Sequence, residues 1–112
     1  MWRPLILLAC LLPVAASAQD CPFTTHGFDA KAVEFEGAAG FSYALRLGNP
    51  GGRSLGLRLD FRWPGALPLA RDEVVAVPVG ARVTRAPVAL IHGPRVPDER
   101  LMAALRITCL RD

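Results

Sequence analysis

A strict alternation of apolar and polar residues runs through SLGLRLDFRW, residues 54–63. From residue 55 onward, odd positions carry leucine, phenylalanine or tryptophan, and even positions carry glycine, arginine or aspartate. Side chains of a β-strand alternate between two faces, so this period of two predicts a strand with one buried and one solvated face. The segment FSYALRL, residues 41–47, repeats the pattern. The chain is therefore expected to be built from half-buried strands.

Turn-forming residues connect these two segments in GNPGGR, residues 48–53. Two alternating runs joined by a short turn are typical of an antiparallel hairpin. If both apolar faces point the same way, the simplest register sets Leu47 opposite Leu55. That register would also set Ala44 against Arg58.

Further short strands are expected on both sides of this hairpin. The β-branched run EVVAVPV ends near Gly80, and its Pro78 indicates an edge strand or a strand end. The additional strand segments are residues 32–36 with Glu34 and Glu36 outward, residues 73–79, residues 82–91 with a bend or break at Pro87, and residues 105–110. Residues 92–99 are expected to form a loop, after which Asp98 could cap a helical turn.

The N-terminal segment has the order of features that is typical of a secretory signal peptide. Arg3 precedes an apolar run over residues 5–16, which ends in the small-residue sequence Ala-Ser-Ala. This order predicts cleavage after Ala18. We therefore expect residues 1–18 to be removed and residues 19–112 to form a single domain.

Two alternatives remain for this leader. A membrane anchor would need about 20 apolar residues, whereas this run is shorter and contains Pro13. A lipoprotein box ending at Cys10 would leave an apolar core shorter than the roughly 7 residues of an export signal. Both alternatives are therefore disfavoured, and no stable membrane insertion is expected after cleavage.

Removal of the leader leaves two cysteines, Cys21 and Cys109, close to the two ends of the mature chain. An exported chain folds in an oxidising compartment, so a disulfide between them is expected. Closing a loop of nearly the whole domain would contribute up to about 4–5 kcal/mol to the free energy of unfolding. The predicted fold is thus an all-β, antiparallel sandwich of six or seven strands, tied by one terminal disulfide.

The order of an alternating strand, Asn-Pro-Gly, a second alternating strand and Val-Pro-Val-Gly gives a further indication of the fold. This order resembles immunoglobulin-like bacterial extracytoplasmic modules over residues 41–91. The resemblance implies an immunoglobulin-like arrangement of the two sheets.

Composition excludes several kinds of partner. The formal net charge is +3, and it falls to +2 without Arg3, which is too small to indicate binding to nucleic acid or to an anionic membrane. A chain with 52% hydrophobic and 21% charged residues is not expected to be disordered. The expected partner is another envelope or secreted protein.

No catalytic or metal-binding motif is found. His26 and His92 each precede a glycine in a segment expected to be a loop, and they are weak metal candidates because CxxC or HxxxH spacing is absent. Ser42 and Ser54, the serines of the mature chain, lie outside any nucleophile motif. We expect no cofactor and no enzymatic activity.

Two surfaces are candidates for binding. The first is the outward face of the expected hairpin, whose arginines could bind carboxylates or phosphates, although a solvated sheet face has the same pattern. These arginines are Arg46, Arg58 and Arg62. The second is the proline-stiffened loop over residues 91–100. Its polar residues are His92, Arg95 and Asp98.

Three function classes fit these observations. The first is a non-enzymatic protein-binding or accessory module of a bacterial cell envelope, located in the periplasm or secreted. The second is a periplasmic inhibitor of a protease or a cell-wall hydrolase, for which a small disulfide-tied β-scaffold is suitable. The third, with less support, is a periplasmic metal-binding protein.

Overall fold

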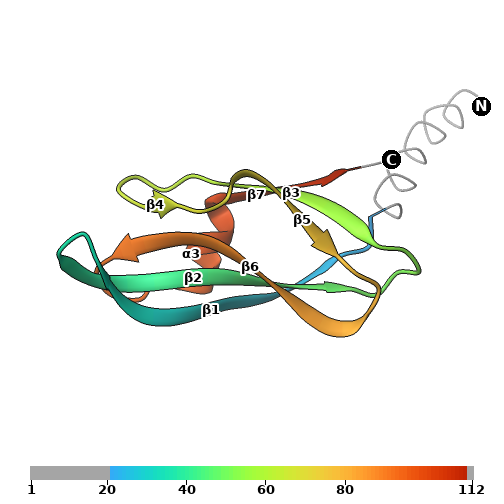
Figure 1. Cartoon of the computed structure of the whole chain (residues 1–112), viewed down its shortest axis with the longest axis horizontal. Helices are drawn as coiled ribbons and strands as arrows, with labels where there is room; N and C mark the ends of the chain where they lie inside the picture. The colour runs from blue at the N-terminus through green and yellow to red at the C-terminus, as the bar shows by residue number, and fades with distance from the viewer. Residues whose placement is uncertain (1–20, 111–112) are drawn as a thin grey trace, which may run out of the picture.

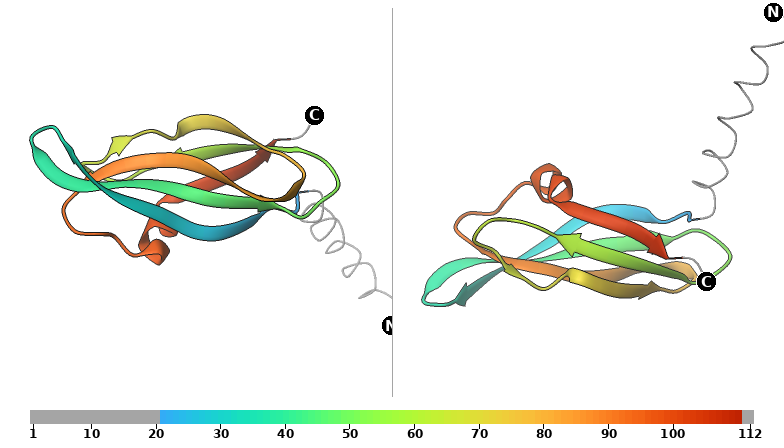
Figure 2. Two further views of the ribbon diagram at one scale, coloured as in Figure 1. Left: turned by 60° about the horizontal axis from the view of Figure 1, so that its bottom comes forward. Right: turned by 90° about the horizontal axis from the view of Figure 1, so that it is seen from above.

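The computed structural model describes residues 21–110, and within this range the side chains of residues 81 and 82 are not described. The expected signal peptide, residues 1–18, lies outside the described residues. Residues 21–110 form two antiparallel sheets stacked face to face, with a short helix at one side (Figures 1 and 2). The prediction of an all-β, two-sheet sandwich is therefore confirmed.

Seven strands and one helix make up this part of the chain. The elements are β1 (Thr24–Phe35), β2 (Ala38–Asn49), β3 (Leu55–Phe61), β4 (Leu67–Pro68), β5 (Arg71–Val77), β6 (Gly80–His92), α3 (Asp98–Ala103) and β7 (Leu105–Leu110). One sheet has the strand order β1-β2-β6-β4 and the other has the order β5-β3-β7.

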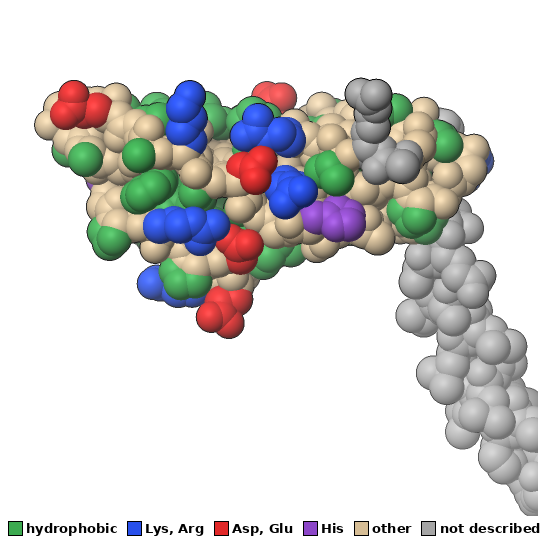
Figure 3. Space-filling model, turned by 90° about the horizontal axis from the view of Figure 1, so that it is seen from below, with side chains coloured by type: hydrophobic (Ala, Val, Ile, Leu, Met, Phe, Trp, Pro, Cys, Tyr) green, Lys and Arg blue, Asp and Glu red, His purple; other side chains and the backbone are tan. Residues whose placement is uncertain are grey.

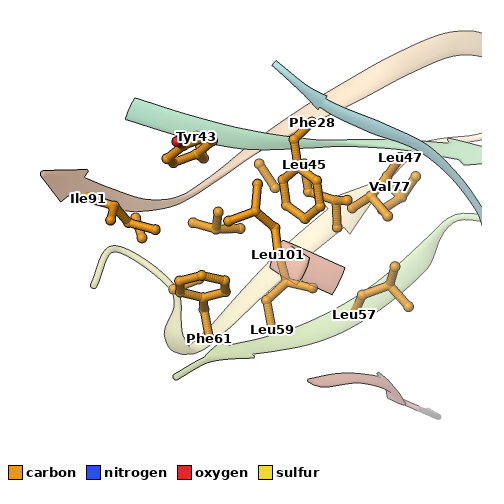
Figure 4. Packing of buried hydrophobic residues seen from close by; sticks show 14 of the residues in the cluster. Phe28, Tyr43, Leu45, Leu47, Leu57, Leu59, Phe61, Val77, Ile91 and Leu101 are labelled. Carbon is orange, nitrogen blue, oxygen red and sulfur yellow. The ribbon is translucent and has the colours of Figure 1, made fainter. Parts of the chain in front are cut away.

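The core lies between the sheets and is filled by the apolar faces that the alternation predicted. Alternate residues of β2 and β3 point inward, so each strand buries one face. The fully buried ones include Tyr43, Leu45, Leu47, Leu57, Leu59 and Phe61. The helix α3 adds Leu101 to the same cluster, where it packs among side chains from both sheets (Figure 4).

The expected hairpin between residues 41–47 and 54–63 is wrong. Hydrogen bonds join β2 to β1 and β6, whereas β3 pairs with β5 and β7, so the two alternating strands lie in different sheets. Ala44 therefore pairs with Asp29 and Pro87, and Arg58 pairs with Val74 and Thr108. A hairpin and a crossing between sheets bury the same apolar faces, so the alternation could not distinguish them.

Asn49 holds the crossing segment between β2 and β3 in place. It is 3% exposed, and its Nδ2 donates hydrogen bonds to the carbonyls of Arg53 (2.7 Å) and Val77 (3.0 Å). Its Oδ1 accepts from the Gly51 N–H at 3.0 Å. One buried amide thus shapes the connection and ties it to the end of β5.

The strand β6 crosses Pro87 without a break. Tyr43 pairs with Ala89 and Ala44 pairs with Pro87, so Val88 is the extra residue of a β-bulge. A bulge leaves one residue out of the ladder, which is where a strand tolerates proline. The sequence predicted either a bend or a break of the strand at Pro87. The break is wrong, and the irregularity is a bulge.

The strand β1 is longer than residues 32–36. Its register with β2 shifts between Thr25 and Phe28, at Gly27, whose φ of 83° is accessible to glycine. Glu36 was expected on a strand but lies with Gly37 in the turn to β2, and both have positive φ. Two such residues between paired strands are typical of a type I′ hairpin turn.

The C-terminal third was predicted in part. The strand β5 ends at Val77, directly before Pro78, and β5 is an edge strand, as expected. The helical turn forms as α3, but its N-cap is Pro97 without a side-chain cap, so the expected capping role of Asp98 is wrong. The strand β7 follows and pairs with β3.

The expected disulfide between Cys21 and Cys109 is confirmed. The two Cα atoms lie 6.3 Å apart, and 88 positions separate them in the sequence. Cys21 precedes β1 and Cys109 belongs to β7, so the bond links the two sheets at the ends of the described chain.

Candidate functional site

The outer face of the three-stranded sheet carries four arginines around one aspartate. Asp60 on β3 lies directly opposite Arg71 of β5 and Arg106 of β7. Arg58 and Arg62 lie two residues to either side of Asp60 along the chain. Residues two apart in a strand, and residues opposite each other on neighbouring strands, share a face. We call Arg58, Arg62, Arg71 and Arg106 the arginine surface.

Only one of these arginines holds the aspartate in an ion pair, among the described residues. Arg62 Nε donates to Asp60 Oδ2 at 2.9 Å, and the Arg62 side chain is 71% exposed whereas that of Asp60 is 17% exposed. This hydrogen bond and the charge of Asp60 raise the pKa of Arg62, and the charge of Asp72 adds to the effect. Arg58, Arg71 and Arg106 have no carboxylate within 4.0 Å in residues 21–110.

The other oxygen of Asp60 has no hydrogen-bond donor. Oδ1 is buried and accepts no hydrogen bond from any described residue. A buried carboxylate oxygen without a donor costs free energy, and a guanidinium that moved toward it would lower that cost. Arg71 and Arg106, its neighbours on either side, are placed to do so. Among the described residues Asp60 is thus bonded to Arg62 alone and does not neutralise the other three arginines of the surface.

A β-bulge sets this arrangement. Leu59 pairs with Glu73, but the register then shifts, so Asp60 pairs with Arg71 instead of Asp72. Asp72 is the extra residue and has a φ of 60°, a conformation that aspartate tolerates better than most side chains. Without the bulge two carboxylates would face each other across the strands, which is unfavourable. The bulge instead brings an arginine to Asp60.

Two open hollows adjoin at Arg62. One has a volume of about 400 Å³ and is lined by Asp60, Arg62, Ala103, Ala104, Leu105 and Arg106. The other has a volume of about 240 Å³ and is lined by Phe61, Arg62, Trp63, Ala66, Pro68 and Arg71. The guanidinium carbon of Arg100 lies 5.2 Å from the centroid of the Trp63 ring, within the range of a cation–π contact. The arginine surface is therefore hollowed as well as charged.

The structure separates the three arginines that the sequence placed together. Arg58 and Arg62 belong to the arginine surface, but Arg46 lies on β2 in the other sheet, so the predicted common face is wrong. Arg46 pairs with Arg85 across the strands, and Asp29 lies 3.9 Å from the first and 2.7 Å from the second. Acidic and basic side chains are interspersed on the face of the molecule that Figure 3 shows.

The candidate loop over residues 91–100 uses its polar groups internally. His92 Nε2 donates to the Phe35 carbonyl at 2.7 Å, and the two rings stack with centroids 3.9 Å apart. Asp98 accepts from the Phe28 N–H at 3.2 Å and from Arg95 at 3.1 Å. These contacts fix the loop against β1. They account for His92, Arg95 and Asp98 without a ligand.

The two histidines are not brought together. His26 lies near the start of β1 and is hydrogen-bonded to Thr24 Oγ1 at 2.9 Å, whereas His92 contacts Phe35 at the end of that strand. Nine residues of strand separate these points, which is roughly 30 Å. No group of three His, Cys, Asp or Glu side chains that could hold a metal ion is found in the described part of the chain.

Sequence reasoning missed Arg71 and Arg106. Both lie far along the chain from Asp60, and only the cross-strand register places them beside it. The alternation around Arg106 and Thr108 was a usable signal, because it placed Arg106 on an outer face. Nothing in the sequence indicated which strand would lie next to it.

No family model, curated protein or solved structure matches the chain. In residues 21–110 no helix is long and apolar enough to cross a membrane.

Proposed function

We propose that this protein is a non-enzymatic binding module of a bacterial cell envelope, which recognises an acidic region of another exported protein through its arginine surface. The observation that carries the proposal is the strand register, which places four arginines next to Asp60, with only Arg62 in an ion pair with it among the described residues. The expected partner carries carboxylates, because arginine side chains bind carboxylates in a planar, two-bond geometry.

The charge balance distinguishes this face from an ordinary solvated sheet. On the four-stranded sheet, Asp29 is within 4.0 Å of both Arg46 and Arg85. On the arginine surface, the only close ion pair in residues 21–110 is between Asp60 and Arg62, and the charge of Asp72 acts on that same arginine. Three guanidinium groups therefore have bonding capacity for a partner.

Export to the periplasm or secretion is part of the proposal. The Cys21–Cys109 disulfide supports it, because such bonds form and persist in oxidising compartments. The leader over residues 1–18 has the composition of a signal peptide.

An immunoglobulin-like topology is also proposed. The neighbours β1, β2 and β6 follow the order of strands A, B and E of immunoglobulin domains, with β3 and β7 in the places of strands C and F. The strand β5 pairs with β3 at the position of the additional strand C′ of variable-type domains. Such sandwiches occur in many cell-surface domains, which agrees with a binding role.

The test is affinity capture with the exported, oxidised protein from its own envelope extract, at low and moderate salt. The variant replaces all four residues of the arginine surface with glutamine. The control removes the same number of positive charges elsewhere, at Lys31, Arg46, Arg53 and Arg85. We expect the variant, and not the control, to lose an identified partner that has an acidic segment, with weaker capture at higher salt.

Equal capture by both proteins would overturn the assignment of the arginine surface. A captured hydrolase that loses activity on addition of the pure protein would make the module an inhibitor. A captured subunit of an assembly would make it an adaptor.

A further inference from the structure

The two sheets end in four edge strands, β1, β4, β5 and β7. An edge strand has unpaired backbone N–H and C=O groups, to which another chain can add as a strand. Natural sandwiches protect their edges with bulges, prolines, very short strands or covering segments. The four edges of this protein differ in this respect.

Three edges carry such protection. The edge of β1 has a bulge at Gly27, and Asp98 accepts the Phe28 N–H at 3.2 Å while Arg95 donates to the Phe28 carbonyl at 3.5 Å. The strand β4 has two residues, one of them Pro68. The strand β5 has a bulge at Asp72 and is followed by Pro78.

The edge of β7 has none of these features. Its six residues contain neither glycine nor proline, and they pair with β3 in one uninterrupted register. On its other side no hydrogen bond from the described residues reaches the β7 backbone. Antiparallel pairing leaves about three N–H and three C=O groups of such a strand free.

We infer that an extended, acidic segment of the partner pairs with β7 and adds a fourth strand to the β5-β3-β7 sheet. This inference rests on the proposed function and specifies its partner. The mode of recognition is β-strand addition, in which backbone hydrogen bonds supply affinity and alternate side chains supply specificity.

The two faces of β7 define the partner sequence. Arg106 and Thr108 lie on the outer face, so an added strand would place alternate side chains next to the arginine surface, where Glu or Asp fits. Leu105 and Ile107 are half-buried and pack against the core, so the intervening side chains would be apolar. The segment is therefore expected to alternate acidic and apolar residues.

Charge also argues against a second copy of this chain as the occupant. Pairing of β7 with another β7 would join two arginine surfaces in one sheet, with eight arginines and two aspartates. Like charges on neighbouring strands are unfavourable. An acidic strand would instead relieve the excess of positive charge.

The probe is a synthetic octapeptide of alternating glutamate and valine, with blocked ends. Amide hydrogen exchange of the oxidised protein would be measured by NMR with and without this peptide. We expect at least tenfold slower exchange at alternate amides of β7 and no change on β1 or β5. Protection of β1 or β5 instead, or protection of β7 that grows with protein concentration alone, would overturn the inference.

Two controls separate strand pairing from charge. A peptide with the same side chains and an N-methyl group at every residue keeps its charge but has no N–H on either edge to donate to β7, so it should bind at least tenfold more weakly. The variant Arg106→Glu should lose the acidic peptide and gain a lysine–valine peptide, whereas Arg46→Glu on the other sheet should change neither.

The outcomes distinguish the inference from the proposed function. If Arg106→Glu weakens binding but N-methylation does not, acidic recognition by the arginine surface stands and strand addition fails. If neither change has an effect, both fail for this probe chemistry.

Discussion

The hydroxyl of Tyr43 accepts a hydrogen bond from the N–H of Val96 at 2.8 Å, across 53 positions of sequence. Tyr43 is fully buried, and Val96 is 9% exposed. The bond therefore fixes the loop before α3 to the middle of β2, inside the core. A tyrosine at this position provides both a large apolar ring and one polar anchor.

Replacement of this tyrosine tests the anchor. Tyr43→Phe keeps the ring but leaves the Val96 N–H without a partner, which should lower the free energy of unfolding by about 1–3 kcal/mol. Urea unfolding measures the change, and Ser54→Ala, which removes an exposed hydroxyl, is the control. A Tyr43→Phe protein as stable as this control would show that the hydrogen bond contributes nothing.

Asn49 supports the second prediction. Asn49→Ala removes the donors to two carbonyls and the acceptor of one N–H, so we expect a loss of about 2–3 kcal/mol in urea unfolding. Arg53→Ala is the matched control, because it keeps the backbone carbonyl that Asn49 binds. If the control lost as much stability, the side-chain amide would not be the cause.

Reduction of the disulfide gives the third prediction. The loop that it closes spans 88 positions, so reduction should lower the free energy of unfolding by up to about 4–5 kcal/mol. The oxidised exported protein should also contain no thiol that reacts with a thiol reagent under denaturing conditions. One reactive thiol per chain in that assay would contradict the pairing.

The ion pairs of Asp29 should contribute little. The side chains of Asp29, Arg46 and Arg85 are 42%, 43% and 63% exposed, and exposed ion pairs are worth about 0–1 kcal/mol. Asp29→Asn should therefore change the free energy of unfolding by less than about 1 kcal/mol. A loss as large as that expected for Asn49→Ala would mean that these charges are coupled more strongly than their exposure implies.

Binding of acidic peptides should weaken at acidic pH and should not weaken at mildly alkaline pH. Asp60 raises the pKa of Arg62, and a group with a raised folded-state pKa keeps its interaction at every pH below its unfolded-state pKa. It loses that interaction only as the pH rises through the folded-state value, which for arginine lies far above the neutral range. Affinity should therefore stay constant from about pH 6 to 9 and fall as the peptide carboxylates protonate near about pH 4. Titration of the glutamate–valine peptide at constant ionic strength measures this, and a decline between pH 7 and 9 would contradict it.

The sequence predicted strands and their buried faces better than it predicted their partners. The alternation from Leu55 to Phe61 determines which side chains point inward, and the structure buries the expected ones. The same alternation is satisfied whether β3 lies beside β2 or opposite it. In the structure, the buried side-chain amide of Asn49 stabilises the crossing from one sheet to the other. In the sequence, however, an asparagine before Pro-Gly-Gly is equally typical of a hairpin turn.

The predicted common face of Arg46 with Arg58 and Arg62 is wrong for the same reason. Arg58 and Arg62 were recognised because they belong to the same alternating segment as Asp60, and Arg46 was added because β2 was expected beside β3. Arg71 lies opposite Asp60 only because of the bulge at Asp72, which shifts the register by one residue. A shift of this kind depends on the positive φ of one aspartate and leaves no pattern in the sequence.

The disulfide also determines how the domain would respond to mechanical tension. Cys21 and Cys109 stand at the two ends of the described chain with Cα atoms 6.3 Å apart, so a force applied to the termini would pass through the covalent bond between them. The core and the sheets up to Cys109 lie within the closed loop and would carry none of the load. A module fixed at both ends would keep its binding surface intact under a pull that unfolds domains held by hydrogen bonds alone.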